Sequence, residues 1–179
     1  MSAALVPAEE WRKSLLAGRR ALRDAYLRKP SPAQLLRGHT RLIDRILRGL
    51  WQDLQPASHA ALVATGGYGR AELFPSSDID ILVLLAREPT GPERERLERL
   101  VGMFWDIGLE VGHSVRTVHE CAQAAAEDIT VQTALLEARF LAGSRRLFRQ
   151  LTEAVALHLD ARAFLKDKRL EQEQRHAKH

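Results

Sequence analysis

Apolar residues in the first third of the chain recur at helical spacing. Trp11, Leu15, Leu22 and Tyr26 are four, seven and four positions apart, and the pattern stops before Pro30. A second run over residues 35–54 predicts one long amphipathic helix, with Ser31 as its N-cap and a proline in its first turn. We therefore predict an N-terminal helical pair within residues 1–57, packed on the core.

The middle of the chain changes to short apolar runs that are typical of buried strands. Residues 59–65 and 79–86 are rich in Ala, Leu, Val and Ile and are bounded by turn residues. Residues 109–116 alternate between apolar and polar side chains and predict a third strand. A helix is predicted over residues 93–106, so the core is of the α/β (α+β) class.

These elements divide the chain into three parts. The helical pair occupies residues 1–57, and the mixed core occupies residues 58–159. The charge-rich residues 160–179 predict a helix that leads toward a downstream domain not included in this chain. N-cap signals predict further helices in the core after Thr117, Asp128 and Ser144.

Composition indicates a globular protein rather than a disordered or membrane-spanning one. The 179 residues are 45% hydrophobic and 28% charged. The single cysteine, Cys121, excludes an intrachain disulfide and a Cys-based zinc site. The longest apolar run, residues 81–86, is far shorter than the ~20 residues that cross a bilayer, and no signal peptide is evident. We expect a cytoplasmic protein with no membrane partner.

The positive charge of the chain is confined to its N-terminal part. The formal net charge is +4 and the pI is about 9.6, which by itself suggests a nucleic-acid partner. Residues 1–58, however, hold 11 Lys and Arg against 5 Asp and Glu, whereas residues 59–179 hold 16 against 18. A solvated helical face explains this distribution better than a polyanion site, so we do not expect nucleic acid as a partner.

Two aspartates at the start of a predicted strand carry the first chemical signal. Asp78 and Asp80 are two positions apart, so their side chains share one face of the strand. Two like charges beside an apolar strand are unfavourable unless positive charge compensates them. Two Mg²⁺ or Mn²⁺ ions would do so, and such a pair promotes phosphoryl transfer. We predict that both aspartates are catalytic metal ligands.

The glycines before this strand carry the second signal. Gly66 and Gly67 follow a strand and let the backbone approach a bulky anion, and a helix over residues 68–73 would direct its N–H groups at a triphosphate. Arg70 either reaches a phosphate oxygen or forms a surface salt bridge. Ser77 either donates to a phosphate or only turns the chain. The structural alternative for the whole segment is a glycine turn followed by a hairpin.

A third carboxylate is expected from the neighbouring strand. Glu110 fits best because it stands between two apolar residues of the third predicted strand. Alternation also allows an outward-facing, solvated glutamate there. Asp106, at the end of the preceding helix, is the rival candidate.

The residues that carry this chemistry resemble a known family. Gly-Gly-Tyr-Gly-Arg-Ala-Glu-Leu at 66–73 and Ser-Asp-Ile-Asp at 77–80 resemble the nucleotidyltransferase domain of the bifunctional uridylyltransferase/uridylyl-removing enzymes. Blocks over 105–117 and 128–139 are similar to later parts of that domain, and the short segment 173–176 is similar to the start of the connector to the next domain. The resemblance implies a polymerase-beta-like fold with a small mixed sheet flanked by helices. It also implies transfer of UMP from UTP to a tyrosine of the PII signal protein in nitrogen regulation, with release of pyrophosphate.

The resemblance also assigns roles to individual residues. Gly66 and Gly67 would hold the triphosphate, while Asp78, Asp80 and Glu110 would bind metal. Ala71 stands where a glycine is more usual, which matters only if that position needs a positive φ. Because the family's hydrolase and glutamine-sensing domains are not in this sequence, we expect no uridylyl-removing reaction and no direct glutamine control.

Two other functions remain compatible with these residues. The same chemistry could act on another acceptor, such as an RNA 3′ end or a small molecule. Alternatively, the chain could be a non-catalytic module that binds a nucleotide without turnover.

Overall fold

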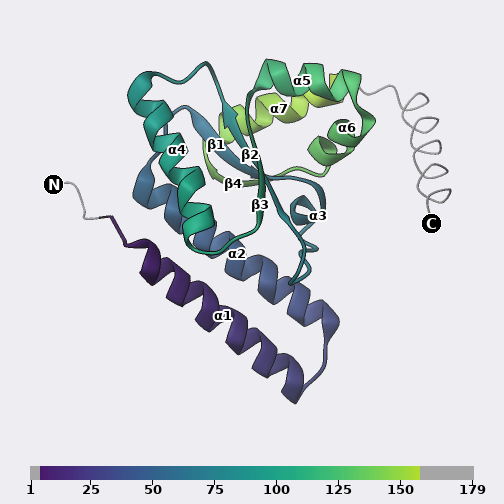
Figure 1. The fold of residues 1–179 in the computed structure, drawn as a ribbon. Helices are drawn as coiled ribbons and strands as arrows, with labels where there is room; N and C mark the ends of the chain where they lie inside the picture. The colour runs from purple at the N-terminus through teal and green to yellow at the C-terminus, as the bar shows by residue number, and fades with distance from the viewer. Residues whose placement is uncertain (1–4, 158–179) are drawn as a thin grey trace.

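A four-stranded sheet lies at the centre of the computed structural model, which describes residues 5–157 (Figure 1). The strand order is β3-β2-β1-β4, with β1 antiparallel to β2 and β4, and β2 parallel to β3. The elements in chain order are α1 (Ala8–Arg28), α2 (Pro32–Leu54), β1 (Ala60–Ala64), α3 (Gly66–Gly69), β2 (Ile79–Leu85), α4 (Gly91–Asp106), β3 (Val111–Thr117), α5 (Val118–Glu127), α6 (Ile129–Leu136), β4 (Arg139–Gly143) and α7 (Arg145–Leu157).

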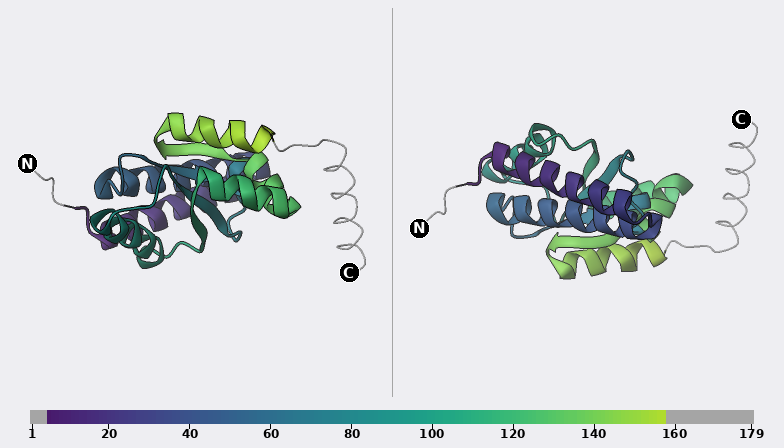
Figure 2. Two further views of the ribbon diagram at one scale, coloured as in Figure 1. Left: turned by 90° about the horizontal axis from the view of Figure 1, so that it is seen from above. Right: turned by 90° about the horizontal axis from the view of Figure 1, so that it is seen from below.

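Helices cover both faces of the sheet. One alternating set of side chains on β2 joins the core formed with α1, α2 and α4: Ile79, Ile81, Val83 and Leu85. The other set, Leu82 and Leu84, joins a separate core with α5, α6 and α7. Figure 2 shows α1 and α2 side by side on one flank and α7 on the opposite flank. The predicted fold class, a small mixed sheet flanked by helices, is confirmed.

The predicted N-terminal helical pair forms because its apolar positions fall on one side of each helix. The buried side of α2 includes Leu42, Leu47 and Leu50, and Ser31 occupies the N-cap as predicted. The capping box that opens α5 also forms, with Thr117 and Glu120 bonded to each other's backbone N–H groups. No helix within residues 5–157 is long and apolar enough to cross a bilayer. The predicted helix over 160–179 lies outside the described residues, and the three-part division stays a prediction.

Two elements differ from the sequence prediction. The edge strand β4 was not predicted, because its five residues mix charged, aromatic and small side chains without clear alternation. The helix expected over residues 68–73 is instead α3, which covers four residues and begins at Gly66. It cannot extend further because Ala71 adopts a left-handed conformation, with φ of 61°.

The position of Ala71 therefore does need a positive φ, and we expect a glycine there to be more stable. Ala71→Gly should raise the free energy of unfolding by about 1 kcal/mol, because an L side chain is strained in this conformation. Urea denaturation measures the change. Ala86→Gly is the control, because Ala86 is exposed and has no positive φ, and no gain is expected there. Equal effects of the two substitutions would contradict the strain at Ala71.

Candidate active site

The glycine turn and the two aspartates meet where β1 ends and β2 begins. The N–H of Thr65, the last residue before α3, donates to the backbone carbonyl of Asp80 at 3.0 Å. A polar cavity of about 480 Å³ opens beside this junction. Its lining includes five of the residues predicted from sequence: Gly67, Arg70, Ser77, Asp78 and Asp80. The structure thus brings the two motif halves to one site.

The Asp80 carboxylate fits between two residues that have no side chain. A Cβ atom on Gly66 would lie 3.2 Å from Oδ2 of Asp80, and one on Gly112 would lie 2.8 Å from Oδ1. Gly112 is the partner of Asp80 in the parallel register of β2 and β3. Gly66 also has a positive φ, of 55°, so a side chain there would be both strained and crowded. These glycines leave room for the carboxylate and for what it binds.

The charge of the aspartate pair is not neutralised by protein groups. Asp78 and Asp80 are two positions apart and share the face of β2 that turns toward α5–α7. Within residues 5–157, neither carboxylate has a hydrogen bond or an ion pair. Partial burial, and then the nearby Asp78 charge, raise the pKa of Asp80. Paired, oxygen-rich and unneutralised carboxylates are what a divalent cation requires, so these two residues fit the predicted metal ligands.

The raised pKa of Asp80 has a consequence for stability. As the pH rises, the unfolded chain loses this proton before the folded protein does, so stability falls from the ordinary pKa of 3.8 up to the raised pKa. Without divalent ions, we therefore expect Asp80→Asn to raise the free energy of unfolding at neutral pH and to leave it unchanged well below 3.8. Urea titrations at two pH values test this. A gain of the same size at both values would contradict it.

Glu110 lies beside the pair but not in the cavity lining. The backbone N–H of Ile79 donates to the carbonyl of Glu110 at 3.0 Å, and Glu110 precedes Gly112 by two residues. Its side chain is therefore on the Asp80 face of the sheet, although it is exposed. In the described part of the chain, no group of three His, Cys, Asp or Glu side chains is arranged to hold one ion. Glu110 as the third ligand stays a prediction, and the rival Asp106 is exposed at the end of α4.

Arg70 forms surface salt bridges, which is one of the two roles predicted for it from the sequence. Its Nε donates to Glu72 at 3.1 Å, and its guanidinium also pairs with Glu137 after α6. These hydrogen bonds, with Glu72 first, raise the pKa of Arg70. Because Arg70 also lines the cavity, the ion pairs hold a positive group at its wall. Ser77 is exposed at the same wall, and its N–H donates to the carbonyl of Phe74.

A buried polar cluster that the sequence did not reveal holds α3 in place. Asp44 of α2, which is 7% exposed, accepts a 2.7 Å hydrogen bond from the Tyr68 hydroxyl. It also accepts two from Arg139 of β4, at 2.8 and 3.1 Å. The same guanidinium donates to the carbonyls of Tyr68 and Gly69. Burial, and then the Asp44 charge, raise the pKa of Tyr68. The sequence held one signal for this cluster, because Asp44 is a lone acid on the apolar side of the helix predicted over residues 35–54.

A second contact from α2 fixes the loop after α3. Nδ1 of His39 lies 3.3 Å from the carbonyl of Leu73, and the hydroxyl of Thr40 donates to the carbonyl of Ala71 at 3.1 Å. Burial lowers the pKa of His39. Because a carbonyl oxygen only accepts, Nδ1–H of His39 is the donor to Leu73. The backbone that leads from the glycine turn to Asp78 is therefore anchored to the N-terminal helical pair.

Comparison with known families identifies this arrangement. The family model described as "Nucleotidyltransferase domain" matches residues 43–134, just over half of the chain. The chain belongs to the nucleotidyltransferase domain family. The match includes α3, both aspartates and Glu110, so the family is recognised through the elements that form the site.

Full-length relatives extend the similarity over most of the chain. A bifunctional uridylyltransferase/uridylyl-removing enzyme of Nitrosospira multiformis is 49% identical over 96% of this chain. Those of Bordetella avium and Chromobacterium violaceum are 52% and 43% identical over 83% and 100% of it. The matched regions cover 20%, 17% and 21% of these relatives, so the chain spans about a fifth of their length. The resemblance inferred from the motifs is confirmed.

Proposed function

We propose that this chain is a metal-dependent nucleotidyltransferase that moves UMP from UTP to a tyrosine of the PII signal protein, with release of pyrophosphate, in the cytoplasm. The observation that carries the proposal is the unneutralised Asp78–Asp80 pair at a polar cavity beside a glycine turn. The relatives named uridylyltransferases support the choice of the uridylyl group.

In this proposal, Asp78 and Asp80 hold two Mg²⁺ or Mn²⁺ ions, and Glu110 completes the set from the neighbouring strand. Bound ions of this kind neutralise a triphosphate and lower the pKa of an attacking hydroxyl. Because Gly66 and Gly112 carry no side chains, an ion and a phosphate would reach the Asp80 carboxylate without any side chain having to move away.

The protein's own groups position the two substrates. The N–H groups of Gly66 and Gly67, in the first turn of α3, have no partner inside the helix and face a phosphate group in this proposal. Arg70 exchanges a carboxylate for a phosphate oxygen. The tyrosine oxygen forms a bond to the α-phosphorus, the bond from that phosphorus to the pyrophosphate oxygen breaks, and the tyrosine proton passes to Glu110 or to water.

Incubation with labelled UTP, Mg²⁺ and PII tests the proposal. We expect label on a PII tyrosine together with equimolar pyrophosphate. Label on RNA or on a small molecule instead would favour the same chemistry with another acceptor. UTP binding without transfer to any acceptor would favour a nucleotide-binding module.

A further inference from the structure

The outer edge of β3 is open to hydrogen bonding. β3 is the last strand on its side of the sheet. The Ile79–Glu110 hydrogen bond fixes the parallel ladder, so Gly112 and Ser114 bond to β2 while Val111, His113 and Val115 direct their N–H and C=O groups outward. In the described part of the chain, these outward groups have no hydrogen-bond partner. The edge closes at Thr117, whose N–H donates to Glu120.

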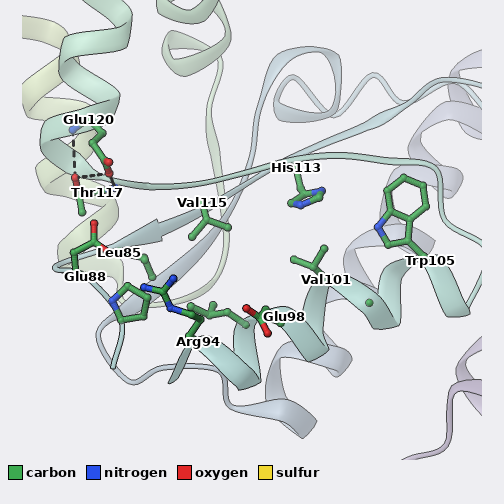
Figure 3. Close-up of a pocket in the computed structure, with 13 residues that line it drawn as sticks. Leu85, Glu88, Arg94, Glu98, Val101, Trp105, His113, Val115, Thr117 and Glu120 are labelled. Carbon is green, nitrogen blue, oxygen red and sulfur yellow. Dashed lines mark hydrogen bonds between the residues drawn. The ribbon is translucent and has the colours of Figure 1, made fainter. Parts of the chain in front are cut away.

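An apolar groove runs along this edge. It has a volume of about 550 Å³ and lies between α4 and β3, on the face opposite Asp80. Figure 3 shows His113 and Val115 of β3 across from Val101 and Trp105 of α4. Trp105 and Val115, which both line the groove, are 56% and 42% exposed, so the groove presents apolar surface to solvent.

We propose that the open edge of β3 and this groove bind an extended segment of the acceptor protein, which adds to the sheet as a strand and presents its tyrosine to Asp80 across Gly112. The inference rests on the proposed function for the presence of an acceptor tyrosine. It adds the site and the conformation in which that tyrosine arrives.

Strand addition would place the acceptor tyrosine on the face of the sheet that holds Asp80. A residue paired with Gly112 has its side chain on the Asp80 side of the sheet, whereas residues paired with His113 and Val115 fill the groove. Two strand spacings, about 10 Å, separate the added backbone from β2. Gly112 has no side chain to block the path, and the Asp80 carboxylate leans over it. Because the Asp80 carboxylate already extends toward β3, the long side chain of tyrosine reaches it, and the short side chain of serine does not.

The groove also defines the chemistry of the segment. An extended backbone pairs with the outward N–H and C=O groups in register and displaces the water on them, as in other strand-addition complexes. The apolar lining favours an apolar side chain three residues from the tyrosine, opposite Val115. The charged side chains around the groove are three acids and one base, Glu88, Glu98, Glu120 and Arg94, so a basic residue in the segment complements it.

The test removes the open edge without breaking the sheet. Val115→Pro deletes an outward N–H and leaves the bonds to β2 in place. We expect the KM for PII to rise by about tenfold or more, with the affinity for UTP and the melting temperature unchanged. Val115→Thr keeps the N–H and the branched shape, so its KM should stay within about twofold. Glu98→Lys replaces an exposed acid of the groove by a base, so it should also raise the KM for PII. This variant tests the proposal if Val115→Pro does not fold.

Hydrogen exchange of the β3 amides tests strand addition independently of the proposed catalytic function. PII added to the wild-type protein should protect the amides of Val111, His113 and Val115. No protection there, or wild-type KM values in both Val115→Pro and Glu98→Lys, would overturn strand addition. Absence of labelled PII with the wild-type protein would instead count against the proposed function.

Discussion

Nucleotidyl transfer should fall at least about 10³-fold when Asp78 and Asp80 are both replaced by Asn. The two amides keep the shape of the carboxylates but remove the negative charge that would hold divalent ions. Because neither carboxylate is bonded to another described residue, the fold should not depend on them. The labelled-UTP assay measures the loss, and circular dichroism checks that the variant is folded.

Ligand-induced stabilisation gives this prediction a second readout. Mg²⁺ and UTP at 100 times their dissociation constant should stabilise the wild-type protein by about 2.7 kcal/mol and the double variant hardly at all. Glu95→Gln is the matched control, because Glu95 is an exposed acid of α4 outside the cavity lining, and full activity is expected. Retained transfer in the double variant would refute the assignment of both aspartates.

Loss of the Asp44 carboxylate should destabilise the protein by about 3–5 kcal/mol. In Asp44→Ala, the Arg139 guanidinium keeps its half-buried position without its main partner, and the buried Tyr68 hydroxyl loses its acceptor. Urea denaturation measures the change. Since the cluster holds α3, a variant that stays folded should also bind UTP more weakly.

Another aspartate of the same helix provides the control. Asp53 accepts a single 3.3 Å hydrogen bond from the indole of Trp11, so Asp53→Ala should cost only about 1 kcal/mol. If the two substitutions were equally mild, the buried cluster would not be what holds α3.

Local patterns in the sequence predicted most of the fold. The apolar spacing of α2 and the branched residues of β2 are properties of neighbouring positions, and both elements formed close to their predicted ends. The short strand β4 forms by pairing with β1, which lies about 80 residues earlier and whose alignment no local pattern specifies. Local sequence propensity therefore did not predict β4, because this strand depends on its pairing with β1.

The residues in and around the candidate site also fall into two groups, those that local sequence predicts and those that only the folded chain reveals. Asp78, Asp80 and the glycines are close in sequence, so their spacing on a strand and a turn could be predicted. Asp44 bonds to partners 24 and 95 residues away, and only the folded chain brings these together. The left-handed Ala71 belongs to this second group, because its carbonyl is held by Thr40 from another helix.

The contacts from α2 to the loop between α3 and β2 set a lower limit on the smallest stable fragment of this domain. The family match begins at residue 43, in the middle of that helix. A fragment cut there would lose both His39 and Thr40, along with Leu15 of α1 from the core. Any transfer of this nucleotidyltransferase domain into another protein therefore has to include α1 and α2.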